Sequence, residues 1–224
     1  FPYTTLFRSI PEYCYKAILR FKHTSPTKPQ HAPYPFQPPQ YGQLIQYASS
    51  LPSPSECKLS PQQLQELQEI TGTFRWYADA LDSTMAMPIS SLSTDTNNIN
   101  KSELNRRKNQ FLDYVATHPN AKLKYKASGM HLWAHTDASY LSETKARSRA
   151  GGFYYLSDKP SLPILSNDPP PPLNGAIAVK SKIIDAVMSS AQEAETGAGF
   201  YNAKELLPLR QTLEELGHPQ GPTP

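Results

Sequence analysis

The distribution of proline limits what this chain can fold into more than any other feature of its sequence. The chain has 23 prolines among 224 residues, and many of them lie in residues 22–59 and 158–174. A proline removes a backbone N–H and fixes φ, so neither stretch can form a continuous helix or a central strand. We therefore expect a loop over 158–174 and an extended tether over 22–59, whose aromatic residues from His31 to Phe36 can lie on a neighbouring surface.

Three helices are expected between these two stretches. Ser60-Pro61-Gln62-Gln63 is typical of a helix start, because serine caps the helix, proline suits its first position and glutamine can return a hydrogen bond to the cap. A second start lies at Asp82-Ser83, and a third helix is expected over about 101–117. Apolar residues at helical spacing indicate a small bundle, and a further short helix is expected within residues 10–21.

The second half of the chain carries strand signals followed by a helix signal. Strand formers concentrate in four segments, at residues 122–125, 130–137, 151–157 and 176–179. In the second segment the side chains alternate, so that His131, Trp133, His135 and Asp137 should share one face. A helix should begin at Ser189-Ser190 and end or kink at Pro208, with one more short helix over 209–216.

Two carboxylates stand out in this half. We expect Asp137 at the point where its strand gives way to a loop. We expect Glu195 to face inward, because it shares a helical stripe with mostly small or apolar residues, namely Met188, Ala191, Ala198, Asn202 and Leu206. A buried carboxylate needs a cation, a hydrogen-bond donor or a metal. Either the two acids hold a divalent metal, or Asp137 caps a turn and Glu195 pairs with an arginine.

Positive charge is concentrated near the first of these acids. The chain as a whole carries a net charge of only +3, but residues 101–149 contain ten basic side chains and four acidic ones. Such a zone is either a solvated surface or a track for phosphates, and its position beside a candidate metal site favours the track.

Cysteine and hydropathy indicate the compartment. The two cysteines, Cys14 and Cys57, form neither a disulfide framework nor a metal site, which favours a reducing intracellular environment. No apolar run approaches the ~20 residues that a membrane span needs. We therefore expect no contact with a membrane.

Several short motifs occur in a fixed order over residues 135–220. They are His135-Thr136-Asp137-Ala138-Ser139-Tyr140-Leu141, Lys145-Ala146-Arg147-Ser148-Arg149-Ala150-Gly151-Gly152-Phe153, Asn174-Gly175-Ala176-Ile177, Ser189-Ser190 through Asn202-Ala203-Lys204-Glu205, and Leu213-Glu214-Glu215-Leu216-Gly217-His218-Pro219-Gln220. Together they resemble the ribonuclease H region of copia-type LTR retrotransposon polyproteins. The preceding segment, with Gly72 to Ala78 and Asp82 to Met85, resembles the helical connection between polymerase and ribonuclease H in the same elements.

The resemblance implies an α/β fold. Residues 121–224 would form an incomplete ribonuclease H-like domain, a mixed sheet with a helix, truncated at its C-terminal side. Residues 60–120 would be the helical connection segment, and residues 10–59 a short helix with the Pro-rich tether. Residues 1–9 resemble a translated sequencing adaptor, so we exclude them from reasoning about the fold.

The resemblance also implies a chemistry. In this family a strand aspartate, a helix glutamate and a further aspartate hold two Mg²⁺ or Mn²⁺ ions, which cleave the RNA strand of an RNA–DNA hybrid. Asp137 and Glu195 match the first two acids, and the third would follow Gly221-Pro222-Thr223-Pro224, so we expect this fragment to be largely inactive. Ser139, Tyr140 and Gln192 are candidate nucleic-acid contacts, each of which can instead have only a local structural role. Lys145, Arg147 and Arg149 are candidate phosphate contacts, which can instead form a solvated turn.

The implied partners are an RNA–DNA hybrid and the polymerase portion of the same polyprotein, within a cytoplasmic virus-like particle or the nucleus. Lys145, Arg147 and Arg149 are expected in a turn between the first two strands. Two other classes stay open, namely a nucleic-acid-binding module without chemistry and an inactive genomic relic that does not fold alone.

Overall fold

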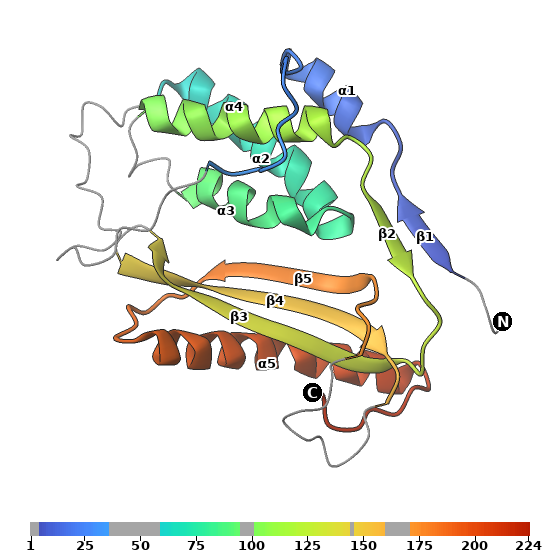
Figure 1. The fold of residues 1–224 in the computed structure, drawn as a ribbon. Helices are drawn as coiled ribbons and strands as arrows, with labels where there is room; N and C mark the ends of the chain where they lie inside the picture. The colour runs from blue at the N-terminus through green and yellow to red at the C-terminus, as the bar shows by residue number, and fades with distance from the viewer. Residues whose placement is uncertain (1–4, 36–58, 95–100, 144–145, 160–170) are drawn as a thin grey trace. The chain divides into compact units, whose positions relative to one another are not determined.

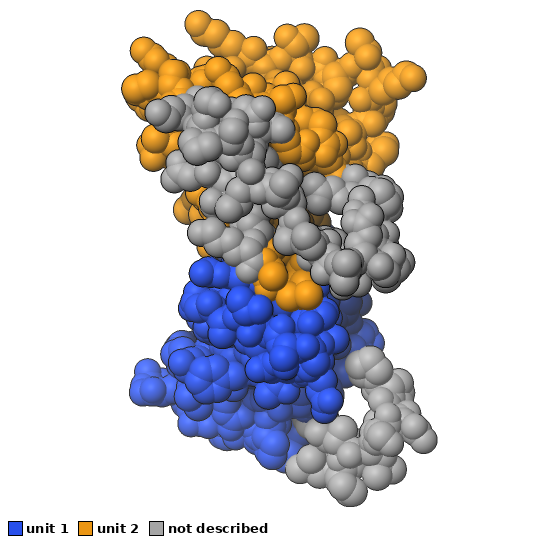
Figure 2. All heavy atoms as spheres, turned by 90° about the vertical axis from the view of Figure 1, so that its left-hand side faces the viewer, with its two compact units in different colours: residues 1–8, 123–140, 147–224 blue, residues 9–122, 141–146 orange. Residues whose placement is uncertain are grey.

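The computed structural model describes residues 5–35, 59–94, 101–143, 146–159 and 171–224, and these form a mixed α/β chain (Figure 1). The chain forms two compact units (Figure 2): unit 1 comprises residues 1–8, 123–140 and 147–224, and unit 2 comprises residues 9–122 and 141–146. The division after residue 122 lies close to the boundary expected after residue 120. The family names given to the two parts stay predictions.

The helices of unit 2 are α1 (Tyr13–Arg20), α2 (Pro61–Ala80), the short 3-10 helix η1 (Ser83–Met85), α3 (Ala86–Thr94) and α4 (Lys101–Thr117). The helices expected from the sequence are confirmed, including the start of α2. There the Gln63 backbone N–H donates to Ser60 Oγ at 3.2 Å, and the Ser60 N–H donates to Gln63 Oε1 at 3.1 Å. Each bond satisfies a backbone N–H that would otherwise lack a partner at the helix start.

The core of unit 2 lies between α1, α2, α3 and α4. Phe74 and Phe111 are fully buried and meet edge to face, with ring centroids 5.4 Å apart. The Leu64 side chain near the start of α2 is exposed, because the buried stripe of this helix begins one turn later at Leu67. Burial raises the pKa of the Cys14 thiol to about 11, so this cysteine stays protonated.

Residues 22–35 are not a free tether. They form a strap along α4, held by hydrogen bonds between side chains and backbone. His23 Nε2 lies 2.7 Å from Asp113 Oδ1, and the Gln30 N–H donates to Thr117 Oγ1 at 3.0 Å. The expectation that aromatic residues of this segment lie on a neighbouring surface is confirmed for the Tyr34 ring, which lies under the Arg107 guanidinium at 5.1 Å.

Within the described residues, five strands form two sheets. Strands β1 (Leu6–Ser9) and β2 (Lys122–Tyr125) form a two-stranded sheet, and β3 (His131–Glu143), β4 (Arg147–Ser157) and β5 (Ala176–Ile183) form a three-stranded sheet in that order. The expected strands are confirmed, but the described three-stranded sheet is antiparallel and not mixed, since its strands follow one another directly (Figure 1). Residues 6–9, which we excluded from the fold, pair with β2; their adaptor origin stays a prediction.

Helix α5 (Ala191–Glu215) covers one face of this sheet and approaches β4 closely (Figure 1). Asn202 is 2% exposed, and its amide donates to the carbonyls of Gly151 and Ala198, both at 2.9 Å. The Tyr154 hydroxyl donates to Asn202 Oδ1 at 2.5 Å. Burial raises the pKa of Tyr154 to about 12, which keeps this donor proton in place.

The helix does not end at Pro208, so the expected end there and the expected separate short helix over 209–216 were wrong. The chain continues as one helix from Ala191 to Glu215 with Pro208 inside it. Leu206 and Leu209 flank the proline and pack against the core cluster formed by Leu132, Tyr154 and Leu213. Packing on both sides of the proline therefore offsets the cost of its missing backbone donor.

The segment after α5 returns to the outer edge of β3. The side-chain amide of Gln220 accepts from the Leu132 N–H and donates to the Met130 carbonyl, both at 2.9 Å. Arg210 of α5 donates to Thr223 Oγ1 at 2.7 Å and to the carbonyls of Gly221 and Gln220. This part of the edge strand is therefore covered by side-chain hydrogen bonds.

Gly152→Ala should destabilise the protein. A Cβ at this position would overlap Asn202 Oδ1 and lie 2.6 Å from the Tyr154 hydroxyl, both held in place by hydrogen bonds. We expect a loss of about 1–3 kcal/mol in the free energy of unfolding, measured by urea denaturation. Gly199→Ala, in α5 where a Cβ meets nothing within 4 Å, is the control and should stabilise by up to about 1 kcal/mol. Equal effects would contradict this packing.

Tyr154 should make folding stability sensitive to alkaline pH. The folded protein holds its phenolic proton more tightly than the unfolded chain, whose tyrosine pKa is about 10. The contribution is therefore fully present below pH ~10 and is lost as the pH rises toward 12. Free energies of unfolding measured across this range should fall more steeply for the unmodified chain than for Tyr154→Phe. Parallel curves would contradict the assignment.

Candidate functional site

Asp137 lies in the middle of β3, not at its end. The strand continues to Glu143, and the Asp137 side chain is exposed. Ala134 and Ala138 pack into the clusters beneath α5. Since side chains of a strand alternate, Asp137 points to the opposite face, together with Trp133 and His135.

Glu195 is exposed, so the expectation that it faces inward was wrong. The buried stripe of α5 is formed by Ala194, Ala198 and Asn202. The expectation rested on a stripe of residues shared with Glu195. Of these residues, Met188 lies before the helix begins and Ala191 is exposed. The helix buries alanines against the sheet and leaves the carboxylate in water, which avoids the cost of desolvating a charge.

The start of α5 determines the surroundings of two further candidate residues, Tyr140 and Gln192. The Glu193 N–H donates to Ser190 Oγ at 3.1 Å, while Glu193 Oε2 accepts from the N–H and the hydroxyl of Ser189, both at 2.6 Å. These bonds from Ser189 lower the pKa of Glu193. The Tyr140 hydroxyl donates to the Ser189 carbonyl at 3.0 Å and so joins β3 to the helix start. Gln192 is exposed in the first turn.

The candidate basic contacts differ from one another. Lys145 lies outside the described residues. Arg147 and Arg149 begin β4, so the expectation that they lie in a turn was wrong; pairing of β4 with β5 extends to Arg149 and Ile183. Arg149 is buried, and its Nη1 donates to Ser181 Oγ at 3.1 Å. Ser139 is exposed on the same face of β3 as Asp137.

An aromatic pair on the Asp137 face was not predicted. The rings of His135 and Tyr155 stack with centroids 5.4 Å apart, and His135 Nε2 lies 3.2 Å from the Tyr155 hydroxyl. Trp133 Nε1 donates to the Asp158 carbonyl at 2.9 Å. Alternation along β3 placed His135 and Trp133 on this face, but their partners depend on cross-strand register, which the sequence of one strand does not contain.

Asp137 and Glu195 offer the oxygen ligands that Mg²⁺ prefers. Within the part of the chain that the structure describes, however, no three or more acidic, histidine or cysteine side chains come together as a metal site. The described residues therefore do not fit a complete magnesium centre by themselves. The metal-binding roles of Asp137 and Glu195 stay predictions.

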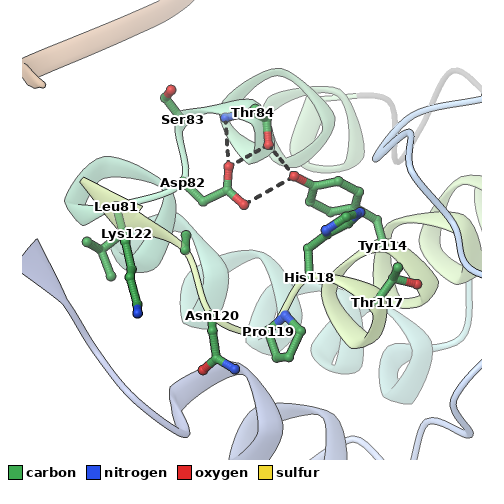
Figure 3. Close-up of a pocket in the computed structure, with 11 residues that line it drawn as sticks. Leu81, Asp82, Ser83, Thr84, Tyr114, Thr117, His118, Pro119, Asn120 and Lys122 are labelled. Carbon is green, nitrogen blue, oxygen red and sulfur yellow. Dashed lines mark hydrogen bonds between the residues drawn. The ribbon is translucent and has the colours of Figure 1, made fainter. Parts of the chain in front are cut away.

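Unit 2 contains a polar hollow of about 580 Å³ between the turn after α2 and the end of α4 (Figure 3). The buried Asp82 carboxylate accepts from the Thr84 N–H at 3.2 Å, the Thr84 hydroxyl at 2.5 Å and the Tyr114 hydroxyl at 3.2 Å. These bonds fix the start of η1, which explains why an acid is buried there. None of the sequence-predicted site residues lines this hollow.

Comparisons of the chain with protein-family models, with curated proteins and with solved structures found no match in any of the three. Among the described helices, none has both the length and the apolar character needed to cross a membrane.

Asp137→Asn and Glu195→Gln should each leave stability within about 0.5 kcal/mol of the unmodified chain. Both side chains are exposed, and neither forms an ion pair with a described residue. Urea denaturation would measure this, with Asn202→Leu as the contrasting variant, because loss of its buried amide should cost about 1–3 kcal/mol. A large loss for either acid variant would assign that acid a structural role.

Proposed function

We propose that this chain is a fragment of a copia-type retrotransposon reverse transcriptase and ribonuclease H, whose parent protein hydrolyses the RNA strand of RNA–DNA hybrids. The observation that carries the proposal is the order of elements in unit 1. Three antiparallel strands, β3, β4 and β5, are followed by α5, which packs across β4. That order agrees with the fold that the sequence motifs imply.

The contact between α5 and β4 offers a physical reason for glycine and asparagine in the motifs that resemble the family. Gly151 and Gly152 lie where α5 crosses the sheet, and Asn202 is the residue of α5 that meets them. In the sequence these residues belong to separate motifs that resemble the family. Their convergence in one packing contact supports reading the motifs as parts of one domain.

In this proposal Asp137 and Glu195 supply two of the carboxylates of the parent enzyme. When bound there, Mg²⁺ or Mn²⁺ would supply the activated water. Further carboxylates must come from outside the described residues, because these form no group of three ligands. The partners are an RNA–DNA hybrid and the polymerase portion of the same polyprotein, in a virus-like particle or the nucleus.

A nucleic-acid-binding module without chemistry is the second candidate. The aromatic side chains of Trp133 and His135 favour it, because they lie on the face of the sheet that α5 does not cover. Exposed aromatic and polar side chains on a sheet are suited to stacking and hydrogen bonding with nucleotides. In that case binding of a hybrid would be sensitive to salt but indifferent to Mg²⁺ and to Asp137.

The test is cleavage of a labelled RNA–DNA hybrid in Mg²⁺ or Mn²⁺. It compares the 224-residue chain with a longer piece of the polyprotein that includes the next strand and its acid. We expect turnover by the longer protein to exceed that of the present chain by orders of magnitude, because shared carboxylates hold both metal ions. Asp137→Asn should abolish cleavage by the longer protein.

Three outcomes would each overturn part of the proposal. Full cleavage by the 224-residue chain, abolished by Asp137→Asn, would contradict the proposal that this chain lacks a carboxylate needed for turnover. No cleavage by either protein, together with a cooperative thermal melt, would remove the enzymatic claim and favour the binding module. A chain with no cooperative melt would instead be a relic that does not fold alone.

A further inference from the structure

The basic side chains of the described chain fall into two kinds. Those on helices are largely neutralised by neighbouring acids: Arg106 pairs with Glu103 at 2.6 Å, and Lys108 pairs with Glu66 at 2.9 Å. The lysines of the β2 segment, Lys122, Lys124 and Lys126, form no ion pair with any described residue. Three positive charges of the basic zone without a neighbouring acid therefore lie on one short segment.

Lys122 and Lys124 lie on β2, and Lys126 follows directly after its last residue with the same alternation of exposure. Lys122, Lys124 and Lys126 are exposed, whereas Leu123 and Tyr125 between them are half-buried. Alternation along a strand therefore places the three ammonium groups on one side, with backbone positions about 6.6 Å apart. Lys124 also lies over the Phe7 ring, with 6.0 Å from Nζ to the ring centroid, a contact that leaves its charge unneutralised.

The row is held on a fixed backbone. The Tyr125 hydroxyl donates to the Ala176 carbonyl at 3.1 Å, on the side opposite the lysines. The Asn174 side chain accepts from the Lys126 N–H at 2.7 Å and donates to the Lys126 carbonyl at 2.9 Å. A Cβ on Gly175 would lie 2.7 Å from the Lys124 carbonyl, so the two segments are in close contact. The fold thus sets the spacing of the backbone positions that carry the lysines.

We propose that Lys122, Lys124 and Lys126 form a binding surface for the phosphate backbone of a nucleic-acid strand. Regularly spaced, unneutralised lysines complement a regular row of negative charges, and lysine binds phosphate as a point charge without reading sequence. The inference rests on the proposed nucleic-acid partner and adds where its backbone is held. Arg149, which was expected to contact phosphate, is buried, whereas these three lysines face solvent.

The experiment measures binding of a fluorescent RNA–DNA hybrid by the full chain in EDTA, as anisotropy at salt concentrations from about 50 to 200 mM. Each phosphate contact contributes about 0.7 to 0.9 to the slope of log affinity against log salt. Replacing Lys122, Lys124 and Lys126 together by alanine should therefore make the slope shallower by about 2 to 3.

The matched control replaces three basic residues that are already paired. Lys16, Arg75 and Lys180 form ion pairs with Glu12, Asp79 and Glu205 at 2.8, 3.3 and 3.2 Å. Replacing these three by alanine changes net charge equally and should leave the slope unchanged. Circular dichroism melts of both triple variants establish that each remains folded.

Equal slopes for the two triple variants, or displacement of the hybrid by polyglutamate as readily as by unlabelled RNA, would overturn the phosphate surface. Because EDTA prevents metal-dependent cleavage, binding is measured separately from turnover. Salt-dependent binding through these lysines without any cleavage by the longer protein would refute the nuclease alone. Cleavage that persists with an unchanged slope would refute only the lysine surface.

Discussion

The amide of Asn202 is the contact on which the architecture of unit 1 depends. Its N–H groups donate to the Gly151 carbonyl of the sheet and to the Ala198 carbonyl of its own helix, and its Oδ1 accepts a hydrogen bond from the Tyr154 hydroxyl. A buried amide is stable only when its donors and acceptor are satisfied, so this contact fixes both the rotation and the height of α5 above β4. The absence of a side chain at Gly152 is the complementary requirement, because only glycine permits that approach.

Local signals in the sequence were sufficient to predict most helices and strands. The capping residues Ser60 and Gln63 act over three residues, so their bonds could be predicted without knowledge of the tertiary fold. The side of a helix that faces the core was harder to predict. In a helix one residue corresponds to a rotation of about 100°, and the buried stripe begins at Ala194, so the neighbouring Glu195 turns to solvent. The expected end of the helix at Pro208 was wrong for a related reason, because tertiary packing outweighed the tendency of proline to end a helix.

The candidate site was predicted only in part. Alternation along β3 gave the face on which His135 lies, and the start of α5 was evident from Ser189-Ser190. The partners across strands, such as Tyr155 for His135, depend on register between segments distant in sequence. The tether was misjudged because proline excludes regular structure without excluding order: the strap from residue 22 to 35 has neither helix nor strand, yet His23 and Gln30 bond to α4.

The hydrogen bonds of Gln220 bear on self-association. Its side-chain amide takes the positions at Met130 and Leu132 that a strand from another molecule would use to extend the sheet. Gln220 therefore competes, within the molecule, with intermolecular strand addition at one end of β3. The advantage of this competition is kinetic as well as energetic, because the amide is covalently tethered and is present at an effective concentration that no free strand in dilute solution attains.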